Sequence, residues 1–187
     1  MIFTPTKVES ACVIDLEPRF DERGMFARAW CAHEFAAKGL IARLAQVNVS
    51  HNICRSTLRG MHYQLPPHEE AKVVSCIRGA VYDVVLDLRP CSPTYLNWDA
   101  VELTGDNRRM LYLPPGCAHG FQSLTDDTQL LYLVSSYHAP AAARGVRHDD
   151  PVFGITWPLE VAAISEADRN WPDYHSCRRA ATAESAI

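Results

Sequence analysis

Hydrophobic and polar positions alternate over the middle of the chain, which predicts short β-strands separated by turns. Lys72–Ile77 and Ala80–Leu88 are rich in β-branched residues, and the Arg78-Gly79 pair between them is typical of a tight hairpin connection. Further strands are predicted at residues 97–103, 110–113, 121–124 and 128–135, with Pro, Gly, Asp and Asn marking the turns. Regular short strands of this kind indicate an antiparallel β-sandwich or barrel.

The predicted strand at residues 80–88 carries two carboxylates on one face. Strand alternation places Asp83 and Asp87 on the same side as Val81 and Val85. Because charged groups share this face with aliphatic ones, we expect it to be partly hydrated.

Helical signals are few. Residues 31–39 predict one short helix ended by Gly39, and Ser165–Asp168 resembles a capped helical turn. From residue 139 onward Pro and Ala increase, and residues 149–158 suggest an ordered but irregular arm. We expect one domain over residues 1–174 and a loose tail at 175–187, where no pattern would bury side chains.

Composition excludes several classes of protein. The 187 residues are 48% hydrophobic and 21% charged, and the formal net charge of −4 gives no bulk positive surface for nucleic acid. The longest apolar runs are far shorter than the ~20 residues of a membrane helix, and the first residues do not resemble a secretory signal. The seven scattered cysteines form no C-x-x-C pair, so we expect free thiols in a reducing cytoplasm, with no membrane or nucleic-acid partner.

Two histidine motifs resemble the halves of the cupin signature, in which histidines and a glutamate gather inside a small β-barrel to hold a metal. They centre on His62 and His119, but Gln64 stands where cupins have a second histidine and Lys72 where they have the glutamate. An ammonium group has no lone pair for a divalent ion and repels it. A metal site would need His68 or Glu70 as substitutes, so we expect no metal and no cofactor.

Without a metal, the same cluster suits acid–base chemistry on an anionic ligand. A histidine is a suitable base at neutral pH, and a carboxylate on its other ring nitrogen would fix the tautomer. Lys72 is suited to stabilising a negative oxygen that develops on a carbonyl. Each residue alone also has a plain structural interpretation, such as a hydrogen-bonded core histidine; the shared spacing of the group favours a site. Its members are His62, Lys72, His119, Arg59 and Tyr132.

An ordered series of motifs then resembles the dTDP-4-dehydrorhamnose 3,5-epimerase family from about Phe3 to Tyr174. The motifs are Asp21-Glu-Arg-Gly-Met-Phe26, Gln46-Val-Asn-Val-Ser50, Leu58-Arg-Gly-Met-His-Tyr-Gln64, Ala71-Lys72, Asp83-Val-Val-Leu-Asp-Leu-Arg89, Ser92-Pro-Thr94, Leu113-Pro-Pro-Gly-Cys-Ala-His-Gly-Phe121, Asp149-Asp-Pro151, Ile155-Thr-Trp-Pro158 and Ser165-Glu-Ala-Asp168. The resemblance implies a mainly β, cupin-like double-stranded β-helix, or jelly-roll barrel, with a few short helices.

The resemblance also implies a reaction and its catalytic residues. Members of the family remove the protons at C3 and C5, both next to the C4 ketone of a nucleotide-linked 6-deoxyhexulose, and return them to the opposite face. By resemblance His62 is the base, paired with Asp168, and Tyr132 is the opposing acid. Lys72 would lie beside the C4 oxygen and stabilise the enolate.

Substrate binding is implied in the same way. Arg59 and His119 match positions that line the sugar and diphosphate, and Arg23, Gln46 and Asn48 match the nucleotide side. Phe26 would pack on the base, with part of this shell supplied by the partner subunit through an exchanged N-terminal strand. The resemblance therefore implies a homodimer and a nucleotide-diphosphate sugar substrate.

Departures from the family pattern leave alternatives open. Arg28 stands where the family has Glu, His138 replaces a second Tyr near the nucleotide base, and Ala143 replaces a Glu before Arg144-Gly145. A CDP- or GDP-linked sugar and epimerisation at C3 or C5 alone therefore remain open. So do two other classes: a metal-dependent cupin oxygenase or isomerase, and a noncatalytic sugar-nucleotide binding module.

Overall fold

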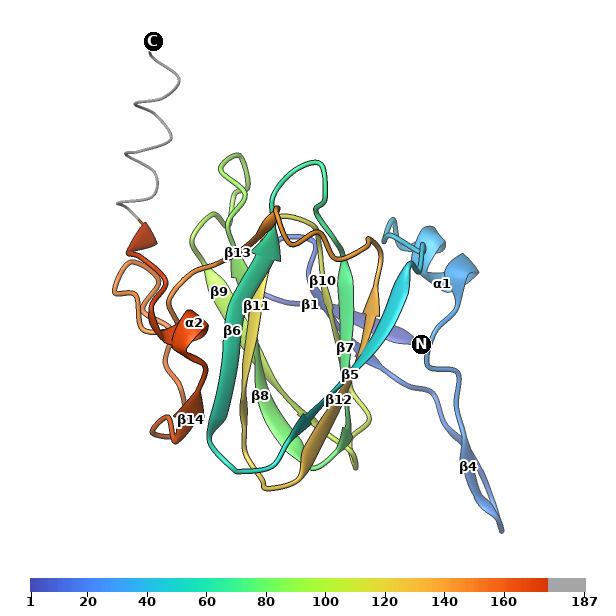
Figure 1. The fold of residues 1–187 in the computed structure, drawn as a ribbon. Coiled ribbons are helices and arrows are strands. Elements are labelled where there is room, and N and C mark those ends of the chain that lie inside the picture. The colour runs from blue at the N-terminus through green and yellow to red at the C-terminus, as the bar shows by residue number, and fades with distance from the viewer. Residues whose placement is uncertain (175–187) are drawn as a thin grey trace.

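Two facing antiparallel sheets form a barrel in the computed structural model, which describes residues 1–174 (Figure 1). The first sheet has the strand order β1 (Ile2–Pro5), β2 (Cys12–Asp15), β10 (Met110–Leu113), β7 (Lys72–Arg78), β12 (Thr128–Val134) and β5 (Gln46–Asn52). The second has the order β13 (Ala143–Gly145), β6 (Thr57–Gln64), β11 (Cys117–Ser123), β8 (Ala80–Asp87) and β9 (Trp98–Thr104), and β14 (Ala163–Ile164) pairs with β6 in parallel. The expected mainly β, cupin-like class is confirmed.

The remaining elements lie at the sides of the barrel. β3 (Arg19–Asp21) and β4 (Gly24–Phe26) form a separate hairpin that projects away from the barrel (Figure 1). The two short helices are α1 (Ala32–Ala37) and α2 (Glu166–Arg169). Within residues 1–174, no helix is long and apolar enough to cross a membrane.

The space between the sheets is filled at one end by aliphatic and aromatic side chains from both. Val74, Leu111 and Leu130 of the first sheet contact Val85 and Phe121 of the second, and all five are almost completely buried. Burial of each such side chain stabilises the fold by about 1.5–3 kcal/mol. The other end of the barrel holds polar residues instead.

The two carboxylates of β8 are fully buried, so the expectation of a partly hydrated face is wrong. Each has a polar partner that replaces water, as a buried charge requires. Asp83 Oδ1 lies 2.8 Å from His119 Nε2, and Asp87 accepts hydrogen bonds from Arg89 and from Thr94 at 2.8 and 2.7 Å. Strand alternation revealed the shared face but not these partners.

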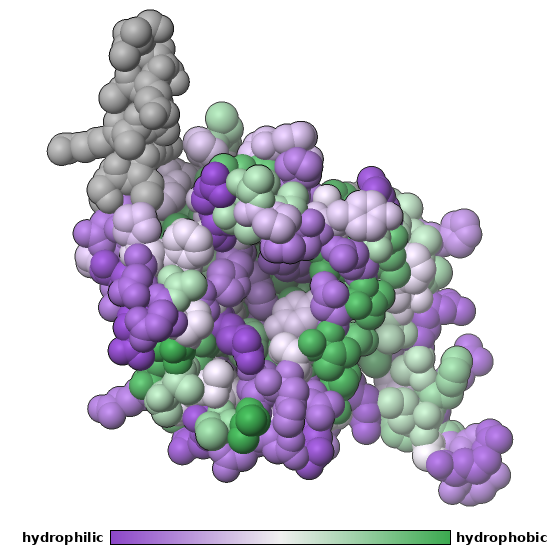
Figure 2. All heavy atoms as spheres, in the orientation of Figure 1, coloured by the Kyte–Doolittle hydropathy of each residue, from purple (hydrophilic) through white to green (hydrophobic). Residues whose placement is uncertain are grey.

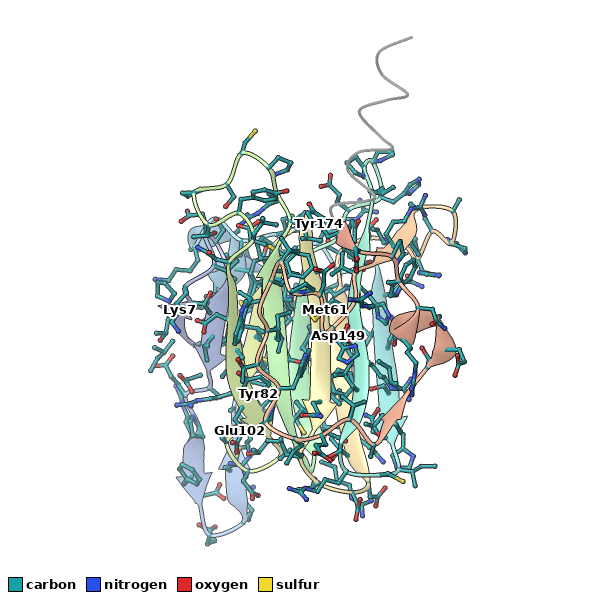
Figure 3. The ribbon with its side chains drawn as sticks, turned by 90° about the vertical axis from the view of Figure 1, so that its left-hand side faces the viewer. Lys7, Met61, Tyr82, Glu102, Asp149 and Tyr174 are labelled. Carbon is teal, nitrogen blue, oxygen red and sulfur yellow. The ribbon has the colours of Figure 1, made fainter. Side chains whose placement is uncertain are left out.

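The predicted irregular arm lies across the outer face of the second sheet (Figure 3). Phe153 and Trp157 of the arm belong to the same hydrophobic cluster as Met61 and Tyr82 of the sheet, and the Trp157 ring packs edge-on against Tyr82. The chain then returns through β14 to α2, where the Ser165 hydroxyl caps the helix by accepting the Asp168 N–H at 3.0 Å. The predicted capped turn is therefore present.

The six cysteines within residues 1–174 form no disulfide. Cys12, Cys76 and Cys117 are buried, whereas Cys54 and Cys91 are exposed. Burial raises the pKa of the Cys117 thiol to about 12, which removes it from thiolate chemistry at neutral pH. Cys177 and the expected loose tail at 175–187 lie outside the described residues.

Candidate active site

A cavity of about 540 Å³ opens between the two sheets at the polar end of the barrel. Figure 2 shows it as a hollow lined largely by hydrophilic residues. Its walls include nine of the residues selected from the sequence: His62, Tyr132, Asp168, Lys72, Gln46, Asn48, Arg59, His119 and His138. The volume falls in the range of small-molecule sites.

His62 on β6 and Asp168 on α2 form a hydrogen-bonded pair, with 2.5 Å between His62 Nε2 and Asp168 Oδ1. Asp168 is 5% exposed, and its other oxygen accepts the Gly60 N–H at 3.3 Å. Burial alone would raise the Asp168 pKa, but the hydrogen bond from His62 and its charge outweigh burial and lower the pKa below the usual value. The carboxylate is therefore ionised at neutral pH and orients the imidazole.

A second histidine–carboxylate pair lies beside the first. His119 on β11 is directly opposite His62 in the β6–β11 ladder and binds Asp83 at 2.8 Å. Both members are buried, and the second Asp83 oxygen has no hydrogen-bond partner among the described residues. Asp83 could not be predicted as a site residue, because its pairing depends on the register of β8 against β11.

Tyr132 approaches the cavity from the opposite sheet. Its ring packs edge-on against His119, with 5.9 Å between ring centroids, and its hydroxyl lies 3.4 Å from Ser50 Oγ. Burial raises the pKa of the Tyr132 phenol well above its usual value, because the phenolate would lose its solvation. The phenol thus carries its proton at neutral pH and faces the same cavity as His62.

Lys72 is held by a carboxylate that the sequence analysis considered only as a substitute metal ligand. Lys72 Nζ lies 2.9 Å from Glu70 Oε1, and the two side chains are only 15% and 12% exposed. The Gln64 side-chain amide donates to the other Glu70 oxygen at 3.0 Å. The chain thus places an internal cation where a metal-binding cupin would have ligands.

The cavity lining also includes Arg59, expected near the sugar and diphosphate, and Gln46 and Asn48, expected near the nucleotide. Arg59 Nε donates to Asn52 Oδ1 at 2.8 Å, and its Nη2 donates to the His51 carbonyl oxygen at 3.4 Å. Gln46 Oε1 accepts the His138 backbone N–H at 2.7 Å and so joins β5 to the segment after β12. Asn48 lies two residues along β5, on the same side as Gln46.

Arg23 and Phe26 do not reach this cavity within one chain. Both lie on the β3–β4 hairpin, where Phe26 is 77% exposed and Arg23 pairs with Asp21. Arg28, just beyond the hairpin, donates to Glu34 at 3.1 Å. Phe26 and Arg28 line a separate hollow at the base of the hairpin.

The residues 1–174 contain no cluster of three or more His, Cys, Asp or Glu side chains able to hold a metal ion. His62 and His119 instead each bind one carboxylate, and the Lys72 ammonium lines the same cavity. The chemistry of this donor set suits proton transfer more than metal coordination.

Comparison with known proteins agrees with these features. The family model described as dTDP-4-dehydrorhamnose 3,5-epimerase matches residues 5–176. The chain belongs to this family. A dTDP-4-dehydrorhamnose 3,5-epimerase from Methanothermobacter thermautotrophicus is 40% identical to it over 172 residues, covering 90% of this chain and 92% of the relative. A dTDP-4-dehydrorhamnose 3-epimerase from Streptomyces niveus is also 40% identical, covering 91% and 82%.

A solved structure of the family shows the same fold with a ligand. The dTDP-6-deoxy-D-glucose-3,5-epimerase from Legionella pneumophila, in complex with dTDP-4-keto-L-rhamnose, superposes on this epimerase with a TM-score of 0.83. It is 32% identical, and the match covers 89% of each chain.

Proposed function

We propose that this epimerase inverts C3 and C5 of a dTDP-linked 4-keto-6-deoxyhexose without a metal. The observation that carries the proposal is the placement of His62, oriented by Asp168, and Tyr132 on opposite sheets facing one cavity. Epimerisation needs a base on one face of the sugar and an acid on the other. The two relatives named for epimerisation and the dTDP-sugar complex support the substrate class.

Each of the three catalytic residues has one step in the proposed proton transfer. His62 takes the proton from the carbon next to the ketone, and the electron pair moves onto the C4 oxygen to form an enolate. The Lys72 ammonium stabilises that oxygen. Tyr132 then donates its proton to the opposite face, which restores the ketone with the carbon inverted. Proton exchange with water returns the imidazolium and the phenolate to their starting forms before the second carbon reacts.

The test is deuterium incorporation followed by NMR. Purified protein is incubated in deuterated water and chelator with dTDP-, CDP- and GDP-linked 4-keto-6-deoxyglucose, and we expect deuterium at C3 and C5 of the dTDP sugar. His62→Asn should abolish incorporation. His51→Asn is the matched control, since His51 binds Asp127 on the surface at 2.6 Å and should leave incorporation unchanged. Undiminished exchange in His62→Asn would contradict the assigned base.

Epimerisation at C3 alone is the second candidate, because the Streptomyces niveus 3-epimerase is as similar as the 3,5-epimerase reported above. The same spectra separate the two reactions. Label at both carbons supports double epimerisation, and label confined to one carbon supports the single-centre enzyme. Tight nucleotide-sugar binding without label would instead support a binding module.

A homodimer is part of the proposal. The β3–β4 hairpin exposes Phe20 and Phe26 at 72% and 77%, and Val47 and Val49 on edge strand β5 are 57% and 62% exposed. Figure 2 shows hydrophobic residues on the surface in the region of β5. Apolar surface of this extent marks interaction sites. The hairpin of one subunit would place Arg23 and Phe26 at the cavity mouth of the other.

Subunit complementation tests this arrangement. The double variant Arg23→Ala/Phe26→Ala and the variant His62→Asn should each be inactive. An equal mixture after subunit exchange should recover about a quarter of wild-type activity, because half of the dimers are mixed and each has one intact site. Light scattering should give twice the chain mass. A monomeric mass, or no recovery on mixing, would contradict the exchanged hairpin.

A further inference from the structure

Trp171 lies beside the candidate base although neither the motif analysis nor the family resemblance selected it. It follows α2 by two residues and lines the cavity. Its indole packs against Gly145 on β13: a Cβ atom at position 145 would lie 2.3 Å from both Trp171 Cε2 and Nε1. Only glycine leaves room for the ring there.

Gly145 is the strand partner of His62. The two residues are directly opposite in the antiparallel β13–β6 ladder, and side chains at such positions project from the same face. The indole therefore takes the space that a side chain of residue 145 would fill, next to the His62 imidazole. Asp168, which binds that imidazole, lies three residues before Trp171 on the same short segment.

The position of the indole costs folding free energy, and packing alone does not explain why the indole is placed there. Trp171 Nε1 is buried without a hydrogen-bond partner among the described residues. An unpaired buried donor costs about 1–3 kcal/mol. By contrast, Trp157 on the neighbouring arm donates its Nε1–H to the His148 carbonyl oxygen at 2.9 Å.

We propose that Trp171 is a positioning residue for the His62–Asp168 pair. α2 has only one turn, so its own hydrogen bonds cannot fix its place on the barrel. Asp168 contacts β6 at Gly60 and His62, and Trp171 provides a second anchor one strand away, on Gly145. The two anchors together fix the direction of the carboxylate toward Nε2. This inference rests on the proposed function of the same site.

Four variants and one control test the role. Trp171→Ala should lower kcat for deuterium exchange roughly 10- to 100-fold, the usual effect of misplacing a catalytic group by about 1 Å. KM and dTDP affinity should change little. Gly145→Ala should lower kcat in the same way by displacing the ring. The double variant should be no worse than Trp171→Ala, because both changes break one contact. Trp171→Phe should restore most of kcat.

The control is Trp157→Phe, which removes an indole N–H from the same side of the barrel. It should leave kcat unchanged, even if loss of its hydrogen bond lowers Tm. Each kcat is divided by the fraction of sites that bind dTDP in calorimetry, so misfolded protein does not count as lost catalysis.

An NMR signature separates positioning from general damage and from failure of the proposed function. The imidazole proton shared by His62 and Asp168 should give a downfield resonance that Trp171→Ala shifts or removes and Trp157→Phe preserves. This measurement needs no substrate, so it stands even if wild-type protein exchanges no deuterium. An unchanged resonance in Trp171→Ala, or additive kcat losses in the double variant, would overturn the proposal.

Discussion

The carboxylate of Asp168 lies 2.5 Å from the Nε2 atom of His62, although 106 positions separate the two residues in the chain. The contact depends on the long arm that crosses the outer face of the second sheet. After the arm, Ala163 and Ile164 pair in parallel with Thr57 and Leu58 at the start of β6, four residues before His62. The capped turn of α2 then places Asp168 at the imidazole. The arm thus links outer-face packing to the acid–base site.

Asp168→Asn should lower kcat for epimerisation at least 100-fold with a small change in KM. An amide at this position would accept poorly from the imidazole and would not stabilise the imidazolium. Because the pKa of Asp168 is below the usual carboxyl value, wild-type protein should keep this carboxylate ionised until the pH falls below about 4. Asp149→Asn, on an exposed carboxylate that binds Arg147, is the control. Comparable kcat losses in the two variants would argue against the pairing.

Tyr132→Phe should separate proton removal from inversion. His62 can still form the enolate, but no acid remains on the opposite face, so the enolate is reprotonated from the side of the base. We therefore expect deuterium at C3 or C5 with retained configuration and at least a 100-fold loss of inverted product, measured by NMR. Tyr137→Phe is the control, because Tyr137 is 64% exposed. Inversion at the wild-type rate would exclude the phenol as the acid.

The raised pKa of the Tyr132 phenol also predicts how kcat should depend on pH in the alkaline range. Since burial raises the pKa of Tyr132 above the usual ~10, its acid form should persist throughout pH 7–10. A loss of kcat that begins below pH 10 must then come from another group, and it should persist in Tyr132→Phe when deuterium incorporation is the readout.

Sequence patterns predicted the strands best where a run of aliphatic and aromatic residues is uninterrupted. Met110–Leu113 was predicted with the bounds that β10 has, and Thr128–Ser135 is one residue longer than β12. β5 and β6 were missed because polar residues such as Asn48 and His62 interrupt the aliphatic alternation. β14 is two residues long and pairs with distant β6, so no local pattern could reveal it.

In the candidate site too, some residues could be predicted from local motifs and others could not. His62, Lys72 and Tyr132 stood out through motif spacing, and the structure brings them to one cavity. Asp83 and Glu70 did not stand out as the partners of His119 and Lys72, because those contacts depend on strand register and on side-chain direction. Arg23 and Phe26 were predicted to bind the nucleotide in the partner subunit. A single chain therefore cannot test that prediction.

Glu70→Ala should lower kcat by releasing the Lys72 ammonium from the position that its ion pair fixes. The pair lies 2.9 Å apart with little solvent exposure, so a removed partner leaves a mostly buried charge without its counterion. We expect a loss of about 10-fold or more in kcat, and a smaller loss in Glu70→Gln, which keeps a hydrogen-bond acceptor for Nζ. Glu69→Ala, the neighbouring position, is the control. Identical kinetics for Glu70→Ala and Glu70→Gln would show that the acceptor does not matter.

Asp87 should govern part of the acid stability of the barrel. Burial by itself would raise the Asp87 pKa, but hydrogen bonds from Arg89, Ser92 and Thr94 outweigh it and lower the pKa to about 2. A pKa that is lower in the folded than in the unfolded chain stabilises the fold above about pH 4, and the stabilisation disappears as the pH falls toward 2. The shift corresponds to about 2 kcal/mol.

Urea unfolding at pH 7 and pH 3 measures this contribution. Asp87→Asn should lower the unfolding free energy at pH 7 by about 1–3 kcal/mol, since an amide cannot accept all of these hydrogen bonds. The difference between variant and wild type should shrink at pH 3, because protonation begins to remove the same contribution from the wild type. Asp106→Asn, on an exposed turn, should change neither value. A difference that stays constant between the two pH values would show that Asp87 acts through packing and not through its charge.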